Sequence, residues 1–219
     1  NLVNNAGYSN DFKLAVNMGG ALGDISWLEG KAGEPATIGF HVLSDPFAPF
    51  ADGAVIVPTT REFVVSVSGT RSIVERANEV GLNAKMAPAN AEPIFVNLKN
   101  QVLKTVPIPF PTFSYKGAAT TLSTDNMYPF VTPGNRLEAG PWEWWDTTTL
   151  KLVVAGTNMQ LGSSYDWKVL HSNGLLTNPN MSKAKAMSYI DTMMMVFTPR
   201  AYLELNLATS TEQVISDDV

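Results

Sequence analysis

The sequence predicts a mainly β protein: a single β-sandwich or jelly-roll-like domain with long Pro/Gly-rich loops and one or two short helices. Many short segments alternate apolar and polar residues, which is the period of a half-buried strand. The chain of 219 residues also holds 16 glycines and 14 prolines, which interrupt these segments with turns. No repeat or clear linker divides the chain. We therefore expect one domain, with two subdomains joined near residues 84–93 as the alternative.

Four short strands are expected in the first third of the chain, over residues 13–18, 36–43, 54–57 and 61–68. The last of these is the clearest, because Phe63, Val65 and Val67 alternate with mostly polar residues. Thr70 is then expected to cap a helix that runs to about Val80.

The second half of the chain is also expected to consist mainly of strands and loops. Strand character is found at residues 94–96, 102–106, 148–155, 166–170 and 201–207. Ser182 is expected to cap a short helix that runs through Tyr189. The apolar run 193–197 either extends that helix or forms a buried strand, because periodicity does not distinguish the two. The domain organisation expected is an N-terminal arm over 1–12, a β-rich domain over 13–208 and a flexible acidic tail over 209–219.

The composition favours a protein that makes contacts over one that performs chemistry. Hydrophobic residues make up 45% of the chain and charged residues only 16%, against roughly 25% charged in an average domain. A net charge of −5 without a basic cluster argues against direct binding of nucleic acid. The absence of cysteine excludes disulfides and thiolate metal sites. No apolar run approaches the length of a membrane span.

Prolines occupy every second position in one segment, which reads Val106, Pro107, Ile108, Pro109, Phe110, Pro111. Each proline fixes φ, removes a backbone N–H and holds the preceding residue extended. One edge of the segment therefore lacks donors, whereas the other can still pair. This pattern is typical of an edge strand or of an extended stretch that lies on a neighbour, so we predict an assembly or ligand contact here.

Three tryptophans within four residues, Trp142, Trp144 and Trp145, follow a Gly-Pro turn. In the internal interpretation two of them fill the end of the core and one covers a loop. In the functional interpretation the exposed rings stack on a carbohydrate or form a hot spot for a protein partner. We predict that all three contribute to an assembly or ligand contact.

Candidate catalytic residues are few. His41 is expected on the polar face of its strand, with Asp45 four residues on, and His171 lies at the end of another expected strand. No nucleophile motif accompanies either histidine, and no metal site is expected. The acidic pairs Asp24 with Glu29 and Glu143 with Asp146 are candidates for hydrolysis only because tryptophans lie nearby.

These observations together predict a structural, self-assembling protein without enzymatic activity or cofactor: a subunit of a viral particle, such as a capsid, cement or tail-tube protein. Its partners would be copies of itself or other particle proteins, and its location the virion. One alternative is a secreted, extracellular β domain that binds carbohydrate or another small ligand through its tryptophans. The other is a hydrolase on a β scaffold that uses acidic residues.

Overall fold

The computed structural model describes residues 7, 11–57, 60, 62–105, 114–115, 118–119, 125–132 and 138–207. The strands are β1 (Leu14–Met18), β2 (Ala21–Leu22), β3 (Ala36–Val42), β4 (Asp52–Ile56), β5 (Phe63–Gly69), β6 (Ser114–Tyr115), β7 (Ala118–Ala119) and β8 (Met127–Phe130). The α-helices are α1 (Thr70–Glu79), α2 (Pro93–Thr105), α3 (Thr147–Leu161), α4 (Trp167–Thr177) and α5 (Lys183–Leu205). Two 3₁₀ helices, η1 (Ile25–Trp27) and η2 (Ala84–Asn90), complete the described elements.

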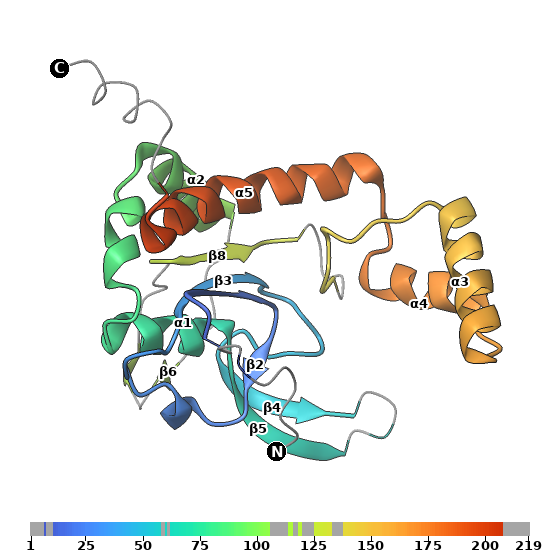
Figure 1. The fold of residues 1–219 in the computed structure, drawn as a ribbon, viewed down its shortest axis with the longest axis horizontal. Helices are drawn as coiled ribbons and strands as arrows, with labels where there is room; N and C mark the ends of the chain where they lie inside the picture. Colours follow the sequence, from blue (N-terminus) through green and yellow to red (C-terminus); the bar gives the residue numbers. More distant parts are fainter. Residues whose placement is uncertain are drawn as a thin grey trace.

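A three-stranded parallel sheet with the order β1-β3-β8 forms the centre of the body. Helix α1 covers one face of this sheet, and α5 runs along the other (Figure 1). Every residue of the middle strand β3 is buried. A strand that is covered on both faces has no polar side, which explains why β3 is apolar almost throughout.

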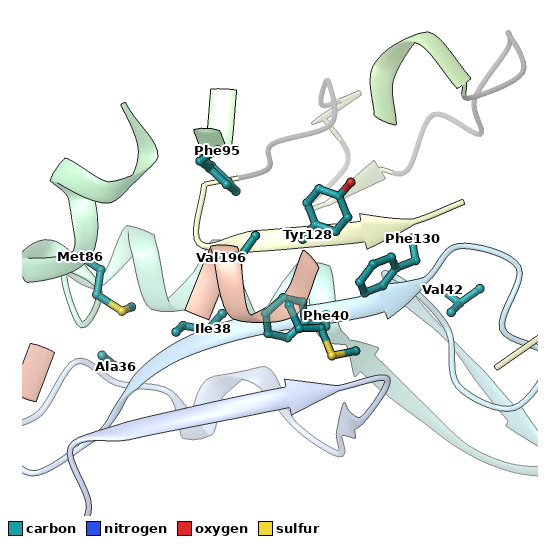
Figure 2. Close-up of a cluster of buried hydrophobic side chains, with 10 residues drawn as sticks. Ala36, Ile38, Phe40, Val42, Met86, Phe95, Tyr128, Phe130 and Val196 are labelled. Carbon is teal, nitrogen blue, oxygen red and sulfur yellow. The ribbon is translucent and has the colours of Figure 1, made fainter. Parts of the chain in front are cut away.

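Alternate residues of β3 face the two sides of the sheet. Ile38, Phe40 and Val42 belong to the main core, together with Val196 of α5 (Figure 2). The ring of Phe130 on β8 lies 6.3 Å from that of Phe40 and extends this aromatic core. The intervening residues of β3 face α1. The sheet is thus held from both sides by apolar burial, the main favourable term in folding.

A second sheet is antiparallel, with the order β2-β5-β4. Its longer pair, β4 and β5, projects from the body as a two-stranded ribbon (Figure 1). We call these two strands the β4–β5 ribbon. Gly69, at the end of β5, is also the N-cap residue of α1 and so joins the ribbon to the body. A two-stranded ribbon of this kind has little stability of its own in water.

The predicted fold class is wrong. The protein is not a mainly β sandwich or jelly roll but a mixed α/β protein with two small three-stranded sheets and five α-helices among the described residues. The prediction failed because apolar alternation was interpreted as strand wherever it occurred. Several of those segments are instead helices whose ends are fixed by capping residues.

The expected strands 148–155 and 166–170 are in fact parts of α3 and α4. Each helix begins directly after an aspartate whose side chain accepts a hydrogen bond from the first turn: Asp146 from the Thr149 N–H and Asp166 from the Lys168 N–H. Gly162 ends α3 in the left-handed conformation, with φ of 61°. These caps satisfy backbone groups that a helix end would otherwise leave unpaired.

The expected last strand, 201–207, is mainly the end of α5. Ser182 caps this helix as predicted, but the helix continues for 23 residues and stops only at Asn206, where φ is 52°. The expected strand character at 94–96 and 102–106 lies largely in α2. Ala201, Leu203 and Leu205 favour helix, whereas residues 94–96, Ile-Phe-Val, have a lower helix propensity. Burial against the sheet adds the stabilisation that short windows of sequence do not reveal.

The strands predicted in the first third are confirmed as β1, β3, β4 and β5, and the helix after Gly69 is confirmed as α1. Thr70 is the first residue of that helix rather than its cap, and Gly81 follows the helix with φ of 83°. The N-terminal arm lies almost wholly outside the described residues, and the acidic tail lies entirely outside them. Of the helices that the structure describes, none combines the length and apolar character needed to cross a membrane.

Gly69→Ala is expected to lower the free energy of unfolding by about 3 kcal/mol, the upper end of the usual cost of overpacking. A Cβ at this position would overlap the backbone of residues 49–51, which cannot rotate away as a side chain could. Urea denaturation followed by tryptophan fluorescence measures the change. The matched control is Gly156→Ala in α3, where a Cβ meets nothing within 4 Å, and a gain of about 0.5–1 kcal/mol is expected. Equal effects at the two positions would contradict this account.

Candidate assembly surface

Helices α3 and α4 form a pair that lies outside the main body, at one end of the molecule (Figure 1). We call residues 147–177 the α3–α4 unit. Of its helical residues only Val154 is buried. Large apolar side chains are open to solvent, with exposed fractions of 70% for Leu152, 83% for Met159, 71% for Leu161 and 72% for Leu176. A helix that is apolar on most sides normally lies in a protein interior, so this surface is of the kind that a partner covers.

The tryptophan segment joins the α3–α4 unit to the body. Trp142 packs against the main core, with its ring 5.8 Å from that of Phe130. Trp145 faces the unit, where its indole N–H donates to Nδ1 of His171 at 3.1 Å. Trp144 lies between them and is 41% exposed. Two of the three predicted contact residues therefore make contacts within the chain, and one ring is available to a partner.

A buried polar cluster lies where the α3–α4 unit meets the body, a place that we call the joint. The ammonium group of Lys185 on α5 pairs with the carboxylate of Glu138, whose side chain is almost fully buried. The ammonium also donates to the side-chain oxygen of Asn178 at 2.6 Å. Asn178 in turn donates to the backbone oxygens of Gly140 at 3.0 Å and Glu143 at 2.9 Å. The chain segments that enter and leave the α3–α4 unit are thus bound to each other and to α5.

The β4–β5 ribbon is a second exposed apolar surface. Ile56 of β4 pairs with Phe63 of β5 and Ala54 pairs with Ser66, so Ile56 and Phe63 lie on the face of Ser66, and both are exposed. On this face lies an open groove of about 440 Å³. Its lining residues are Gly23, Asp24, Ile25, Asp52, Gly53, Ser66, Val67 and Ser68. We call it the carboxylate groove, because Asp24 and Asp52 are the charged residues among those that line it.

His41 does not lie on a polar face, as the sequence suggested, but is fully buried between β3 and α1. Its Nδ1 shares a hydrogen bond of 2.7 Å with the Thr70 hydroxyl, and its Nε2 lies 3.2 Å from the Ala48 oxygen. Asp45 does approach it, at 3.8 Å from Nε2. Burial lowers the pKa of His41, and the Asp45 carboxylate opposes that shift in part. The histidine therefore joins the strand to the helix and presents no face to a substrate.

Three of the four carboxyl groups considered for hydrolysis have local partners. Asp24 caps η1 and Asp146 caps α3, and hydrogen bonds from Ser26 and Thr149 hold the pKa of each carboxyl below its ordinary value. Glu29 pairs with Lys31. A glycosidase requires one carboxyl group whose pKa is raised, so that it can donate a proton, and these shifts have the opposite sign. Within the described ranges, no three His, Asp or Glu side chains converge on a possible metal position.

The predicted contact residues 106–111 lie outside the described residues. The α3–α4 unit, in contrast, was missed by sequence reasoning. The available signal was the pair of aspartates at positions 146 and 166, each one residue before a segment without proline, together with Gly162 between them. Neither a protein-family model, nor a curated protein, nor a solved structure matches this chain.

Proposed function

We propose that this protein is a non-enzymatic structural subunit that assembles with further copies of itself into a large particle, of which a virion is the kind that the sequence favours. The observation that carries the proposal is the α3–α4 unit, which is apolar on most sides and yet lies outside the body. Low overall charge supports the same conclusion, because the buried centre of a protein interface is depleted in charged residues.

The size of the exposed surface fits a stable contact. Eight large apolar or aromatic residues of the unit are exposed: Leu152, Val153, Met159, Leu161, Tyr165, Val169, Leu170 and Leu176. At their exposed fractions these residues present on the order of 1,000 Å², whereas a standard interface buries about 800 Å² per partner. These residues lie on more than one side of the two helices, so a partner covers most of this area only if it packs against several sides of the unit. Such coverage would provide enough apolar burial to hold two subunits together.

Leu152→Gln combined with Met159→Gln is expected to weaken self-association at least a hundredfold, because two apolar anchors on the same side of α3, seven residues apart, become polar. Sedimentation velocity over a range of concentrations measures the association, and negative-stain images show whether the wild-type protein forms particles. Both side chains are exposed, so the urea midpoint should stay close to that of the wild type.

The matched control is Thr148→Gln, a substitution at an exposed polar position of the same helix, which should assemble normally. A wild-type protein that stays monomeric at high concentration would overturn the proposed function. Normal assembly of the double variant would show that the α3–α4 unit is not the contact.

A further inference from the structure

We infer that the α3–α4 unit of one copy docks on the carboxylate groove and the β4–β5 ribbon of a second copy, so that subunits join head to tail. This inference rests on the proposed function and specifies which two surfaces meet. Within one molecule the unit and the ribbon occupy separate places on the body (Figure 1). A contact between them therefore requires two copies of the chain.

The charges of the two surfaces are opposite. Helices α3 and α4 contain Lys151 and Lys168, and the loop between them contains Asp166, so two cations and one anion give the unit a net charge of +1. The carboxylate groove has Asp24 and Asp52, and none of the residues that line it is basic. The hydrogen bonds from Ser26 that lower the pKa of Asp24 keep that carboxylate anionic. A net positive unit and a groove with two anions favour pairing between these unlike surfaces.

The two surfaces also share the apolar character that such a contact needs. On the ribbon, the exposed side chains of Ile56 and Phe63 lie on the same face as Ser66 and Ser68, two of the residues that line the carboxylate groove. The ring of Trp27, which is 64% exposed, lies against Gly23 at the edge of the groove. An exposed tryptophan beside a polar groove is a common anchor in protein interfaces. The docked helices would also give the ribbon the packing partner that an isolated two-stranded ribbon lacks.

A contact between two different surfaces is heterologous, and it has a consequence for symmetry. After two copies pair, one of them still has a free ribbon and the other a free unit, so growth continues until a ring closes or an open array forms. A contact between two identical surfaces would stop at the dimer. The proposed pairing therefore accounts for a large particle with a single kind of subunit contact.

The test is a complementation experiment with two variants. The unit variant carries Leu152→Gln and Met159→Gln, and the ribbon variant carries Ala54→Lys and Ile56→Lys. All four positions are exposed, and Ala54 pairs with Ser66 on the groove face. Sedimentation velocity is measured for each variant and for their equimolar mixture, and circular dichroism with urea denaturation checks that each fold is kept.

Head-to-tail pairing predicts that each variant alone associates at least a hundredfold more weakly than the wild type. Their mixture should form a 1:1 dimer and grow no further, because one intact unit and one intact ribbon remain. A ribbon variant that assembles like the wild type, or a mixture that stays monomeric, would overturn the inference. If the wild-type protein assembles in either case, the proposed function stands. If the wild-type protein does not assemble, the proposed function fails first.

A charge reversal tests the electrostatic part separately. Lys168→Glu and Asp52→Lys are each expected to weaken association by about fivefold, the upper range for an exposed ion pair. In the chain that carries both changes the opposite charges face each other again, and most of the loss should be recovered. Additive losses in the double variant would overturn the proposed orientation.

Discussion

Arg200→Ala is expected to lower the free energy of unfolding by about 3–5 kcal/mol, a large part of the stability of a typical domain. Arg200 lies on α5, and its side chain is fully buried. Its guanidinium donates to the side-chain oxygens of Asn126 at 3.0 Å and Asn90 at 2.6 Å, and to the Val196 oxygen at 2.8 Å. Removing it takes the guanidinium donor from the buried Asn126 oxygen and opens a cavity, whereas the Asn90 oxygen still accepts from the Asn126 N–H at 2.9 Å.

The chemistry of the guanidinium explains why this position is sensitive. Burial lowers the pKa of Arg200 to about 10, and the Asp125 carboxylate opposes that shift. The cation is therefore held by its partners and by the ring of Phe95, whose centre lies 4.1 Å from Cζ. Through Asn126 and Asn90 the guanidinium connects α5 to the start of β8 and to η2. Arginine suits this site because its planar group directs several donors at fixed angles.

Urea denaturation followed by tryptophan fluorescence tests this prediction. Arg200→Lys keeps the positive charge but not the several N–H donors of the guanidinium, so a smaller loss of the free energy of unfolding is expected. This variant provides the measurement if the alanine variant does not fold. Arg76→Ala is the control, because Arg76 is only partly buried and donates to one backbone oxygen, that of Leu28. The Arg76→Ala variant should lose about 1 kcal/mol of the free energy of unfolding. An Arg200→Ala variant as stable as Arg76→Ala would contradict the assigned role.

The parts of the fold that the sequence predicts correctly are those in which local pattern and tertiary burial agree. Strand β5 ends at Gly69, a position where any side chain would overlap the backbone of residues 49–51, so its end is set by a glycine. Helix α1 presents Ile73 and Ala77 to the sheet at helical spacing. In α1 one apolar face meets one layer, which is the situation that periodicity detects. The apolar residues of β5 alternate as well, although Phe63 and Val65 are exposed.

The errors have a common physical origin. In α3 the apolar residues do not face one layer, because the helix lies outside the body, and alternation of Leu150, Leu152 and Val154 then resembles a strand. His41 was placed on a polar face because the sequence does not show that β3 is covered on both sides. The number of layers around an element is a property of the whole fold, and a single sequence does not provide it.

The candidate surface was also predicted only in part. The sequence singled out the tryptophan segment, and the structure places Trp142 and Trp145 in the joint of the α3–α4 unit. The surface of the unit itself was not predictable, since its residues were assigned to strands and loops. The carboxylate groove was not predictable either, because Asp24 and Asp52 are brought together only by the pairing of β2 and β4 with β5.

Lys185→Met is expected to destabilise the joint of the α3–α4 unit by about 3–5 kcal/mol, because it leaves the buried Glu138 carboxylate without its cation. Asn178 and Asn180 lose a donor in the same variant. The loss should be concentrated at the joint, where amide hydrogen exchange in residues 138–146 and 175–190 would become faster than in β3. Urea denaturation measures the total change in the free energy of unfolding.

The double variant Glu138→Leu with Lys185→Met separates the cost of an unpaired charge from the value of the pair. Replacing both partners by apolar residues of similar size removes the buried charge altogether, so most of the stability lost in Lys185→Met should return. If the double variant instead loses the sum of the two single changes, the pair itself stabilises the joint. Recovery of stability without recovery of assembly would show that the ion pair is needed to fix the orientation of the α3–α4 unit on α5.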